Sequence, residues 1–227
     1  MTKPIEGIAE QGSEAWHRAR AGKCTASRFR EVARNRAGSD WSETARSYCF
    51  EIVGERLLLD NPDWVPSPQL KTAAIAHGND MEPFARAAYQ WRTGANIVCY
   101  GFVPWSDCGS VGGSPDGVHV DGSGILEIKC PYTTREHVRT LATGAVPKQY
   151  VAQVQGLLMV TGRDWCDFVS FDNRLADGQT MAVVRVGRDD GYIARLSSLL
   201  QSFAEYVDET ERKVRHDAKR KQHGVVA

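Results

Sequence analysis

The sequence predicts one α/β (α+β) domain, in which helices flank a mixed central β-sheet. Helical and strand-like patterns occur in blocks: helices first, then strands, a helix, two more strands and a closing helix. The length of 227 residues allows one large core, and no repeat or linker divides it. The composition, 42% hydrophobic and 25% charged, is typical of a globular protein. We therefore expect residues 1–227 to form a single domain.

The first part of the chain has helical patterns separated by turn residues. Ser13 is a good N-cap for a helix that ends near Gly22, and Thr25 is the expected N-cap of the next helix. Residues 42–59 carry apolar side chains on one helical stripe. After a proline-rich loop, a further helix is expected over about residues 79–93.

The pattern then changes to short, β-branched segments bounded by turn residues. Residues 96–105, 111–120 and 124–131 are therefore expected to form three strands in a meander. Pro147 opens another helix, which ends near residue 162. The remaining expected elements are strands over residues 165–172 and 181–188 and a long helix from about Asp190, with an apolar stripe of Ile193, Leu196, Leu200, Phe203 and Val207.

Several classes of protein are disfavoured by the composition. No apolar run approaches the roughly 20 residues that cross a bilayer, and the N-terminus lacks the apolar centre of a signal peptide. Six cysteines without a C-x-x-C pair favour reduced thiols in a cytoplasmic protein over a disulfide framework or a zinc site. The 28 basic and 28 acidic residues give a nucleic-acid binder no support, but binding depends on local charge, so they do not exclude one.

Charged residues interrupt one of the predicted strands. Glu127 and Lys129 share a strand face with Ile125, while the alternate face is apolar and is expected to pack into the core. A turn over residues 121–124 should bring Asp116, at the start of the preceding strand, alongside the end of this one. The plainer alternative is a surface ion pair of Glu127 and Lys129, worth roughly 0 to 1 kcal/mol.

Two carboxylates and an ammonium that converge in this way have a chemistry of their own. Carboxylate oxygens suit Mg²⁺, which binds through one or two carboxylates and keeps waters and substrate phosphate as its other ligands. The lysine can orient or deprotonate a metal-bound water. The pattern therefore indicates a hydrolytic site for a phosphodiester.

Five segments resemble one nuclease family. Asp116 followed by Glu127-Ile128-Lys129 resembles the signature of the PD-(D/E)xK superfamily. "GGSPDG", "LEIKCPYTTRE" and "QYVAQVQGLLMVTG" resemble the phage lambda exonuclease family (viral recombinase or alkaline exonuclease type), as do "EAWHRARAGKCTAS" and "HGNDMEPFAR". The resemblance covers about residues 13–190, and it implies a restriction-endonuclease-like core.

The resemblance implies a specific activity. Members of this family digest one strand of linear double-stranded DNA processively from its 5′ end, release mononucleotides and leave a 3′ overhang for recombination by strand annealing. It further implies a preference for 5′-phosphate ends, a homotrimeric ring, a single-strand annealing protein as partner, and a phage or prophage gene acting in the cytoplasm of a bacterial host. A structure-selective or restriction-type endonuclease and a non-catalytic DNA-binding protein are the alternatives.

The resemblance also implies site residues. Asp116, Glu127 and the backbone carbonyl of Ile128 would hold one Mg²⁺, and Asp116 would be shared with a second ion supported by Glu82. Mn²⁺ is expected to substitute. Lys129 would act on the attacking water. Without the resemblance, Glu82 reads as a carboxylate that complements the dipole near the start of its helix.

Other matching residues would bind DNA. Ser27, Arg20, Arg36 and Ser114 match a 5′-phosphate pocket, although Arg36 needs a one-residue shift in the alignment. On residues alone, Arg20 reads as a solvated helix charge. The other matches are Tyr150 and Gln153 near the scissile phosphate, Arg135 on the DNA track and Ile75 at the duplex end.

The chain departs from the family pattern at two places. The turn between Asp116 and Glu127 is one residue longer, which a hairpin loop can absorb without moving the strand ends. The C-terminal segment "ERKVRHDAKRKQHG" is basic. Its default interpretation is a solvated helix end, and an added DNA contact is the alternative.

Overall fold

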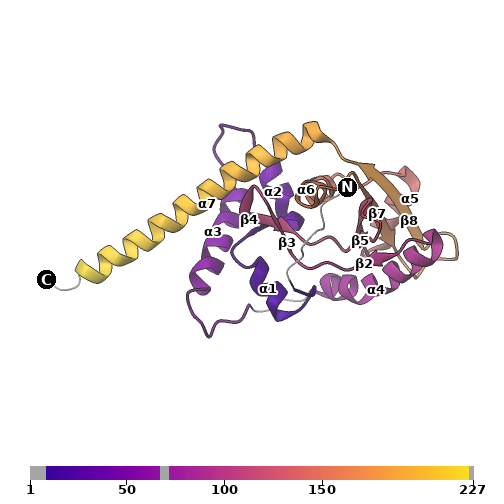
Figure 1. The fold of residues 1–227 in the computed structure, drawn as a ribbon, viewed down its shortest axis with the longest axis horizontal. Helices are drawn as coiled ribbons and strands as arrows, with labels where there is room; N and C mark the ends of the chain where they lie inside the picture. Colours follow the sequence, from indigo (N-terminus) through magenta and orange to yellow (C-terminus); the bar gives the residue numbers. More distant parts are fainter. Residues whose placement is uncertain (1–8, 67–71, 225–227) are drawn as a thin grey trace.

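The computed structural model describes residues 9–66 and 72–224. Its described strands form two sheets, flanked by helices as the sequence predicts (Figure 1). The larger sheet has the order β2-β5-β6-β7-β8 and the smaller has the order β1-β4-β3. Only two of the described strand pairs are parallel, β6 with β7 and β1 with β4. The larger sheet is therefore mixed, as expected.

The bounds of the elements are as follows. The helices are α1 (Glu14–Arg20), η1 (Ala26–Arg28, a 3₁₀ turn), α2 (Phe29–Ala33), α3 (Glu43–Leu58), α4 (Ala73–Thr93), α5 (Thr134–Thr143), α6 (Val151–Thr161) and α7 (Asp190–Gly224). The strands are β1 (Cys24–Thr25), β2 (Ile97–Val98), β3 (Val103–Trp105), β4 (Cys108–Gly113), β5 (Gly117–His119), β6 (Gly124–Lys129), β7 (Trp165–Phe171) and β8 (Met181–Gly187).

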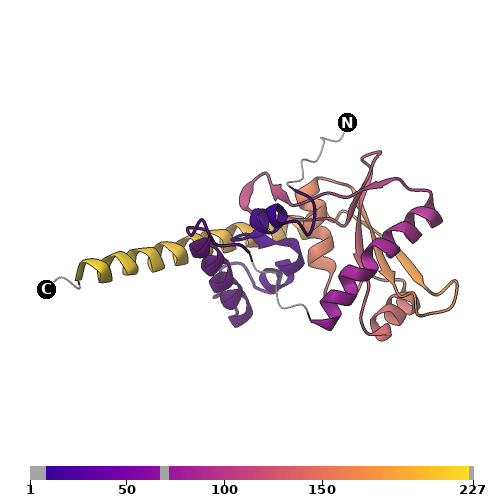
Figure 2. The same cartoon turned by 90° about the horizontal axis from the view of Figure 1, so that it is seen from below.

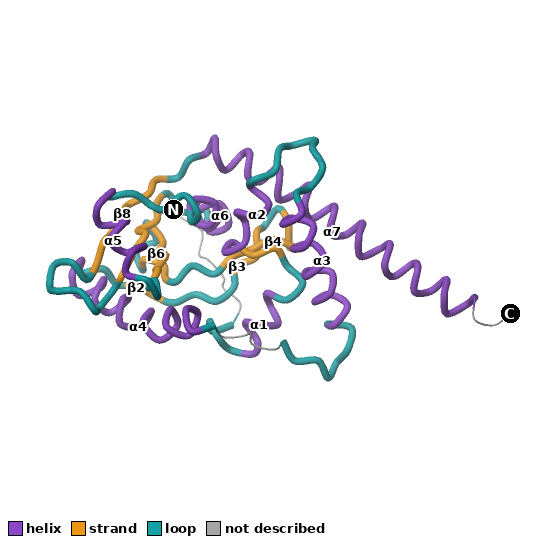
Figure 3. Tube along the Cα trace, turned by 180° about the vertical axis from the view of Figure 1, so that it is seen from behind, coloured by secondary structure: helices purple, strands orange, loops and turns teal. Residues whose placement is uncertain are grey.

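Helices cover both faces of the larger sheet, so its central strands are buried on both sides. On one face, Leu126 and Ile128 of β6 pack with Tyr89 of α4. On the other, Ile125 packs with Leu157 of α6 in the main core. Figure 3 shows α4 and α5 on the outer side of the sheet, with α6 between the two sheets. Glu127 of β6 is therefore buried and Lys129 is partly buried, which excludes a simple surface ion pair.

Helix α7 closes the core. The predicted apolar stripe of this helix is buried, and Leu200 and Phe203 are fully covered. The C-terminal part of α7 projects beyond the rest of the molecule (Figure 2). Over the described ranges, no helix combines the length and apolar character needed to cross a membrane.

Three sequence predictions about elements need correction. The expected meander is wrong, because residues 96–105 and 111–120 each contain parts of two strands, and those parts belong to different sheets. Helix α4 begins at Ala73 instead of about residue 79, because the side chain of Thr72 caps it and the helix continues through Pro83. Thr25 makes no side-chain cap, and the segment after it is a 3₁₀ turn before α2.

Candidate active site

The hairpin of β5 and β6 brings Asp116 to the catalytic strand predicted from the sequence. Gly117 pairs with Leu126 and Val118 with Ile125, so the two strands form the antiparallel hairpin that the sequence predicts. Asp116 lies one residue before β5, and its Oδ2 accepts a hydrogen bond of 2.6 Å from the backbone N–H of Ile128. The carboxylate is thereby held against β6 next to the peptide that carries the Ile128 carbonyl.

Glu127 is the most deeply buried charged residue of the site, with 1% of its surface exposed. Its Oε1 accepts hydrogen bonds from Lys129 Nζ at 2.5 Å and from Gln153 Nε2 of α6 at 2.6 Å. Lys129 Nζ also lies 5.2 Å from the ring centroid of Tyr150. Helix α6 therefore delivers Gln153 and Tyr150 to the same place as the strand residues.

Helix α4 supplies Glu82 from the opposite side of β6. Arg86, one turn later, makes an ion pair with Glu82 and donates a hydrogen bond of 3.1 Å from Nε to the backbone oxygen of Asp116. Since α4 starts at Ala73, Glu82 lies in the third turn and not near the start of the helix. The alternative explanation through the helix dipole is therefore wrong for this residue.

The site concentrates negative charge in a place with little water. Burial, reinforced by the neighbouring Asp116, raises the pKa of Glu127 to about 8 and that of Glu82 to about 7. Burial also raises the pKa of Asp116. For Lys129, burial lowers the pKa, but the charges of Glu127 and Asp116 outweigh it and the net pKa is raised. Lys129 is accordingly an ammonium ion. The positive charge of the site is smaller than the negative charge that its carboxyl groups carry when they are all ionised.

A divalent cation fits this arrangement. Glu127 Oε2 is a buried atom that accepts no hydrogen bond within the described ranges, and an unpaired buried carboxylate oxygen is costly. No group of three or more His, Cys, Asp or Glu side chains in the described part of the chain forms a ready-made metal cage. The unpaired carboxylate oxygen is a hard ligand of the kind that Mg²⁺ takes, with water and substrate completing its shell.

Two serines of the predicted phosphate pocket lie just beyond the C-terminal ends of neighbouring strands in the smaller sheet. Strands β1 and β4 are parallel, and Thr25 is in register with Gly112. Ser27 and Ser114 each follow two residues after these partners, so both serines lie beyond the same strand ends. The exposed Ser27 also lies within 3.4 Å of the Thr25 hydroxyl, oxygen to oxygen.

Trp16 links Arg20 to this pair of serines. Its indole Nε1 donates a hydrogen bond of 2.9 Å to Ser114 Oγ, and the Arg20 guanidinium stacks 4.0 Å above its ring. Arg20 is partly buried by this stacking, which contradicts its interpretation as a solvated helix charge. Arg20 and Ser114 are therefore connected through Trp16, and Ser27 lies beyond the same end of the neighbouring strand β1.

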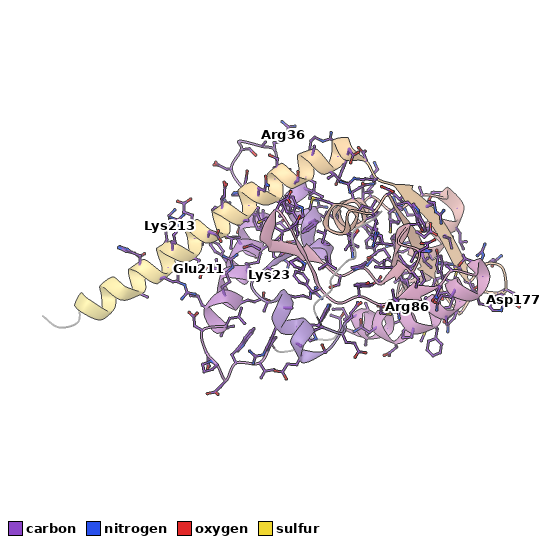
Figure 4. The ribbon with its side chains drawn as sticks, in the orientation of Figure 1. Lys23, Arg36, Arg86, Asp177, Glu211 and Lys213 are labelled. Carbon is purple, nitrogen blue, oxygen red and sulfur yellow. The ribbon has the colours of Figure 1, made fainter. Side chains whose placement is uncertain are left out.

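The structure does not bring every predicted residue to this place. Arg36 lies in the exposed loop between α2 and α3 and points outward beyond α7 (Figure 4). Ile75 lies in the first turn of α4 and is 42% exposed. Arg135 lies in the first turn of α5 with its side chain 85% exposed, and it contacts Glu136 at 3.2 Å.

Two residues of the site were missed in the sequence. Arg86 joins Glu82 to Asp116, and the spacing of Glu82 and Arg86, four apart on a helix, is the signal that could have found it. Trp16 positions Ser114 and Arg20, but no sequence pattern connects residues 98 positions apart.

The chain is similar to one described protein family and to a longer curated protein. A family model described as the YqaJ-like viral recombinase domain matches residues 15–164. A curated relative, the uncharacterized protein R354 of Acanthamoeba polyphaga mimivirus, is 29% identical over 113 residues. That match covers 45% of this chain and 21% of the relative, so the chain spans only about a fifth of that longer protein.

Solved structures are similar over most of the chain. The alkaline exonuclease LHK-Exo from Laribacter hongkongensis is 33% identical with a TM-score of 0.80, covering 92% of this chain and 99% of that one. The same protein in complex with dAMP gives a TM-score of 0.81 at the same identity and coverage. A phage-related exonuclease from Haemophilus somnus 129PT, 16% identical over 85% of this chain and 96% of its own, shares the fold with a TM-score of 0.61.

Proposed function

The chain belongs to the YqaJ-like viral recombinase family, and from this membership and the geometry of the site we propose that it is a deoxyribonuclease. In this proposal it hydrolyses one strand of linear double-stranded DNA in the 5′→3′ direction, releases mononucleotides processively and leaves a 3′ overhang for strand annealing. The observation that carries the proposal is the buried Glu127, whose Oε2 has no hydrogen bond among the described residues while Asp116 and Lys129 flank it.

Three groups of this chain would hold a Mg²⁺ ion: the carboxylates of Asp116 and Glu127 and the backbone carbonyl of Ile128. Glu82 would support a second ion shared through Asp116, and Mn²⁺ is expected to substitute. When bound, such ions activate water and stabilise the attacking and leaving oxygens of a phosphodiester. The excess of negative charge at the site, together with the raised pKa values of its carboxyl groups, supports this assignment.

Lys129 is proposed to orient the attacking water. It is a protonated donor with a raised pKa, and Glu127 Oε1 fixes its ammonium group at 2.5 Å. A charged donor held in this way also stabilises negative charge that develops on the phosphate oxygens. Gln153, which donates to the same carboxylate oxygen, and Tyr150 would contact the region of the scissile phosphate.

The end of the DNA would be recognised by its 5′-phosphate. Ser27, Ser114 and Arg20 offer hydroxyl and guanidinium donors at one edge of the smaller sheet, and such donors suit phosphate oxygens. Arg36 is part of this proposal only by resemblance. Arg135 and Ile75, both exposed, would contact the DNA track and the duplex end.

A similar protein supports the proposed product. LHK-Exo has been solved in complex with dAMP, which is a nucleoside monophosphate. The proposal assigns a mononucleotide of this type as the product released after each hydrolysis. A homotrimeric ring, a single-strand annealing partner and a cytoplasmic phage or prophage origin are further parts of the proposal that rest on the family resemblance. A single nuclease domain over residues 1–227 is also proposed, from the chain length and the lack of a dividing repeat or linker in the sequence.

Digestion of an end-labelled linear duplex tests this function. Wild-type protein with Mg²⁺ is expected to release mononucleotides from the 5′-phosphorylated strand, more slowly without the 5′-phosphate, and not at all in EDTA. Asp116→Asn is the matched variant, because it keeps the size of the side chain and removes its charge. Equal digestion by wild type and Asp116→Asn, or digestion that persists in EDTA, would overturn the proposal.

A further inference from the structure

The segment that follows the catalytic strand is clamped from outside the site. After β6, the chain passes through Pro131 and Tyr132 before α5 begins at Thr134. Arg174 donates hydrogen bonds to the backbone oxygens of both residues, from Nη2 to Pro131 at 3.2 Å and from Nη1 to Tyr132 at 3.0 Å. One guanidinium therefore fixes two consecutive peptides of this short connection.

Arg174 is itself held by a buried carboxylate. Asp172, directly after β7, accepts hydrogen bonds from Arg174 Nε at 2.7 Å and from Nη2 at 2.8 Å. Asp172 is 2% exposed. Its hydrogen bonds with Arg174 keep the pKa of Asp172 well below the ordinary value, so Asp172 and Arg174 both stay charged. The connection is thus anchored to the parallel neighbour of the catalytic strand and is held in place before substrate arrives.

The side chain that this clamp positions is exposed. Tyr132 is 53% exposed, and its ring meets the ring of His77 on α4 nearly at right angles, with 5.8 Å between centroids. It follows Lys129 by three residues, a distance of at most about 10 Å along the chain. Successive nucleotides of one strand rise about 3.4 Å, so the ring lies within reach of the first three nucleotides around the reacting phosphate.

We propose that Tyr132 is a substrate-binding residue that stacks on a nucleobase of the DNA strand held at the active site. This inference rests on the proposed function. It assigns to Tyr132 the role of fixing where the bound strand lies in the active site. An aromatic ring packs on the face of any base, so the contact tolerates all sequences. Arg135, exposed three residues further on, supplies the positive charge that usually accompanies such a ring on single-stranded DNA surfaces.

A stacking contact also explains why the clamp is needed. Ordering a flexible segment on binding costs conformational entropy, which weakens the contact that the segment makes. Asp172 and Arg174 restrict the backbone at Tyr132 beforehand, so little of that cost remains at binding. Arg174 is therefore a positioning residue that acts through Tyr132.

A double-mutant cycle between protein and DNA tests the stack. A single abasic site is placed at each of the first four positions of the 5′-phosphorylated strand, and hydrolysis is measured in single turnovers with wild type, Tyr132→Phe and Tyr132→Ala. With wild type, one position is expected to slow hydrolysis by roughly 5- to 150-fold, the range for one base–aromatic stack. Tyr132→Phe should behave like wild type. Tyr132→Ala should hydrolyse intact DNA slowly, and an abasic site at the sensitive position should not lower its rate further.

Trp91→Ala is the matched control. Trp91 is an exposed aromatic residue of α4 that lies about 21 Å along the helix axis from His77. Its substitution should leave the position-specific loss at the wild-type level. Thermal melting of all three variants should match wild type, because both rings contribute little to the core.

A second measurement separates this inference from the proposed function. Duplexes with the fluorescent base 2-aminopurine at the sensitive position are bound in EDTA, where hydrolysis does not occur. Wild type and Tyr132→Phe should quench the fluorescence, and Tyr132→Ala should not. Quenching without any hydrolysis in Mg²⁺ would overturn the proposed function alone. Hydrolysis with equal abasic losses, or equal quenching, in wild type and Tyr132→Ala would overturn the stacking role alone. Absence of both binding and hydrolysis in Mg²⁺ would overturn both.

Discussion

Lys129 lies where two carboxylates and the face of an aromatic ring meet. Its Nζ contacts Glu127 Oε1 and lies 5.2 Å from the centroid of the Tyr150 ring. Because its raised pKa keeps it protonated, its contribution is that of a fixed positive donor. Loss of such a donor removes stabilisation that is present only where charge develops, while the packing around the site remains.

Lys129→Ala is therefore expected to lower the hydrolysis rate by roughly 10²- to 10⁴-fold while the protein still binds duplex DNA. Single-turnover digestion of end-labelled duplex measures the rate, and binding is measured separately in EDTA. Arg46→Ala, which removes an exposed arginine paired with Glu43 on α3, should digest at the wild-type rate. Wild-type digestion by Lys129→Ala would show that the lysine has no role in the chemistry.

Glu127 carries a cost to folding that depends on pH. Its pKa rises from an ordinary 4.5 to about 8 on folding, so the folded state holds a proton that the unfolded state has lost between these values. The stability of the metal-free protein should therefore fall as pH rises from about 4.5 to 8, and the penalty stays constant above that. This cost is what a bound cation would offset.

Glu127→Gln should remove most of this pH dependence. In EDTA at pH 8 the variant is expected to be more stable than wild type by roughly 1 kcal/mol or more, and to melt roughly 2–4 °C higher for each kcal/mol. At pH 5 the difference should be small. Thermal melting at both pH values measures it, and a variant that follows wild type at both would contradict the buried-charge account.

At the scale of elements, α6 connects the core to the site. It packs against α2 and presents Gln153 to Glu127. The close approach of the two helices depends on Gly156, because a Cβ at this position would collide with the ring of Phe29. The position of Gln153 thus depends on a contact made three residues further along the same helix.

Gly156→Ala should consequently destabilise the protein by about 1 to 3 kcal/mol, as overpacked cores do, and lower activity in proportion to the displacement of α6. Gly54→Ala is the matched control, since Gly54 lies inside α3 with open space where an added Cβ would point, and this variant should gain roughly 0.5 to 1 kcal/mol. Chemical denaturation of both variants measures the difference. A Gly156→Ala variant as stable as Gly54→Ala would contradict the packing.

The central hairpin could be predicted from the sequence because its signals are local. Strand alternation fixes the faces of β6, and a short turn fixes the register, so Asp116 and Glu127 follow directly. The start of α4 could not be predicted, because Gly78 weakens the helical pattern and residues 73–75 are exposed, so that only the side-chain cap at Thr72 marks the start.

The division of the strands between two sheets was also beyond the sequence. Residues 96–105 look like one strand, but their two halves pair with different partners, and long-range pairing leaves no local pattern. The same limit applies to Trp16, which reaches Ser114 only in the folded chain, and to Asp172 and Arg174, whose contacts cross from β7 to the end of β6.

For the whole molecule, the neutral net charge does not conflict with a DNA-processing role. The 28 acidic residues include the carboxylates gathered at the site, where bound cations would supply positive charge that the chain lacks. Arg20 and Arg135 lie at the pocket and on the surface, so local charge differs from the total. A DNA contact by the basic end of α7, which projects from the body in Figure 1, stays a prediction.

A closed circle of duplex DNA separates the proposed exonuclease from an endonuclease with the same core. Recognition through a 5′-phosphate requires a free end, so covalently closed circles should stay intact under conditions that digest the linear form completely. Gel electrophoresis of both forms with Mg²⁺ measures this. Nicked or linearised circles would favour the endonuclease.

The central claim is that the carboxylates of Asp116 and Glu127 share a divalent ion with the backbone oxygen of Ile128. Anomalous diffraction from crystals grown with Mn²⁺ and a 5′-phosphorylated duplex tests it most directly. The account predicts an anomalous peak within coordination distance of these three groups, with Glu127 Oε2 as a ligand. A peak that lies elsewhere, or a Glu127 Oε2 that remains without a ligand while the DNA is bound, would contradict it.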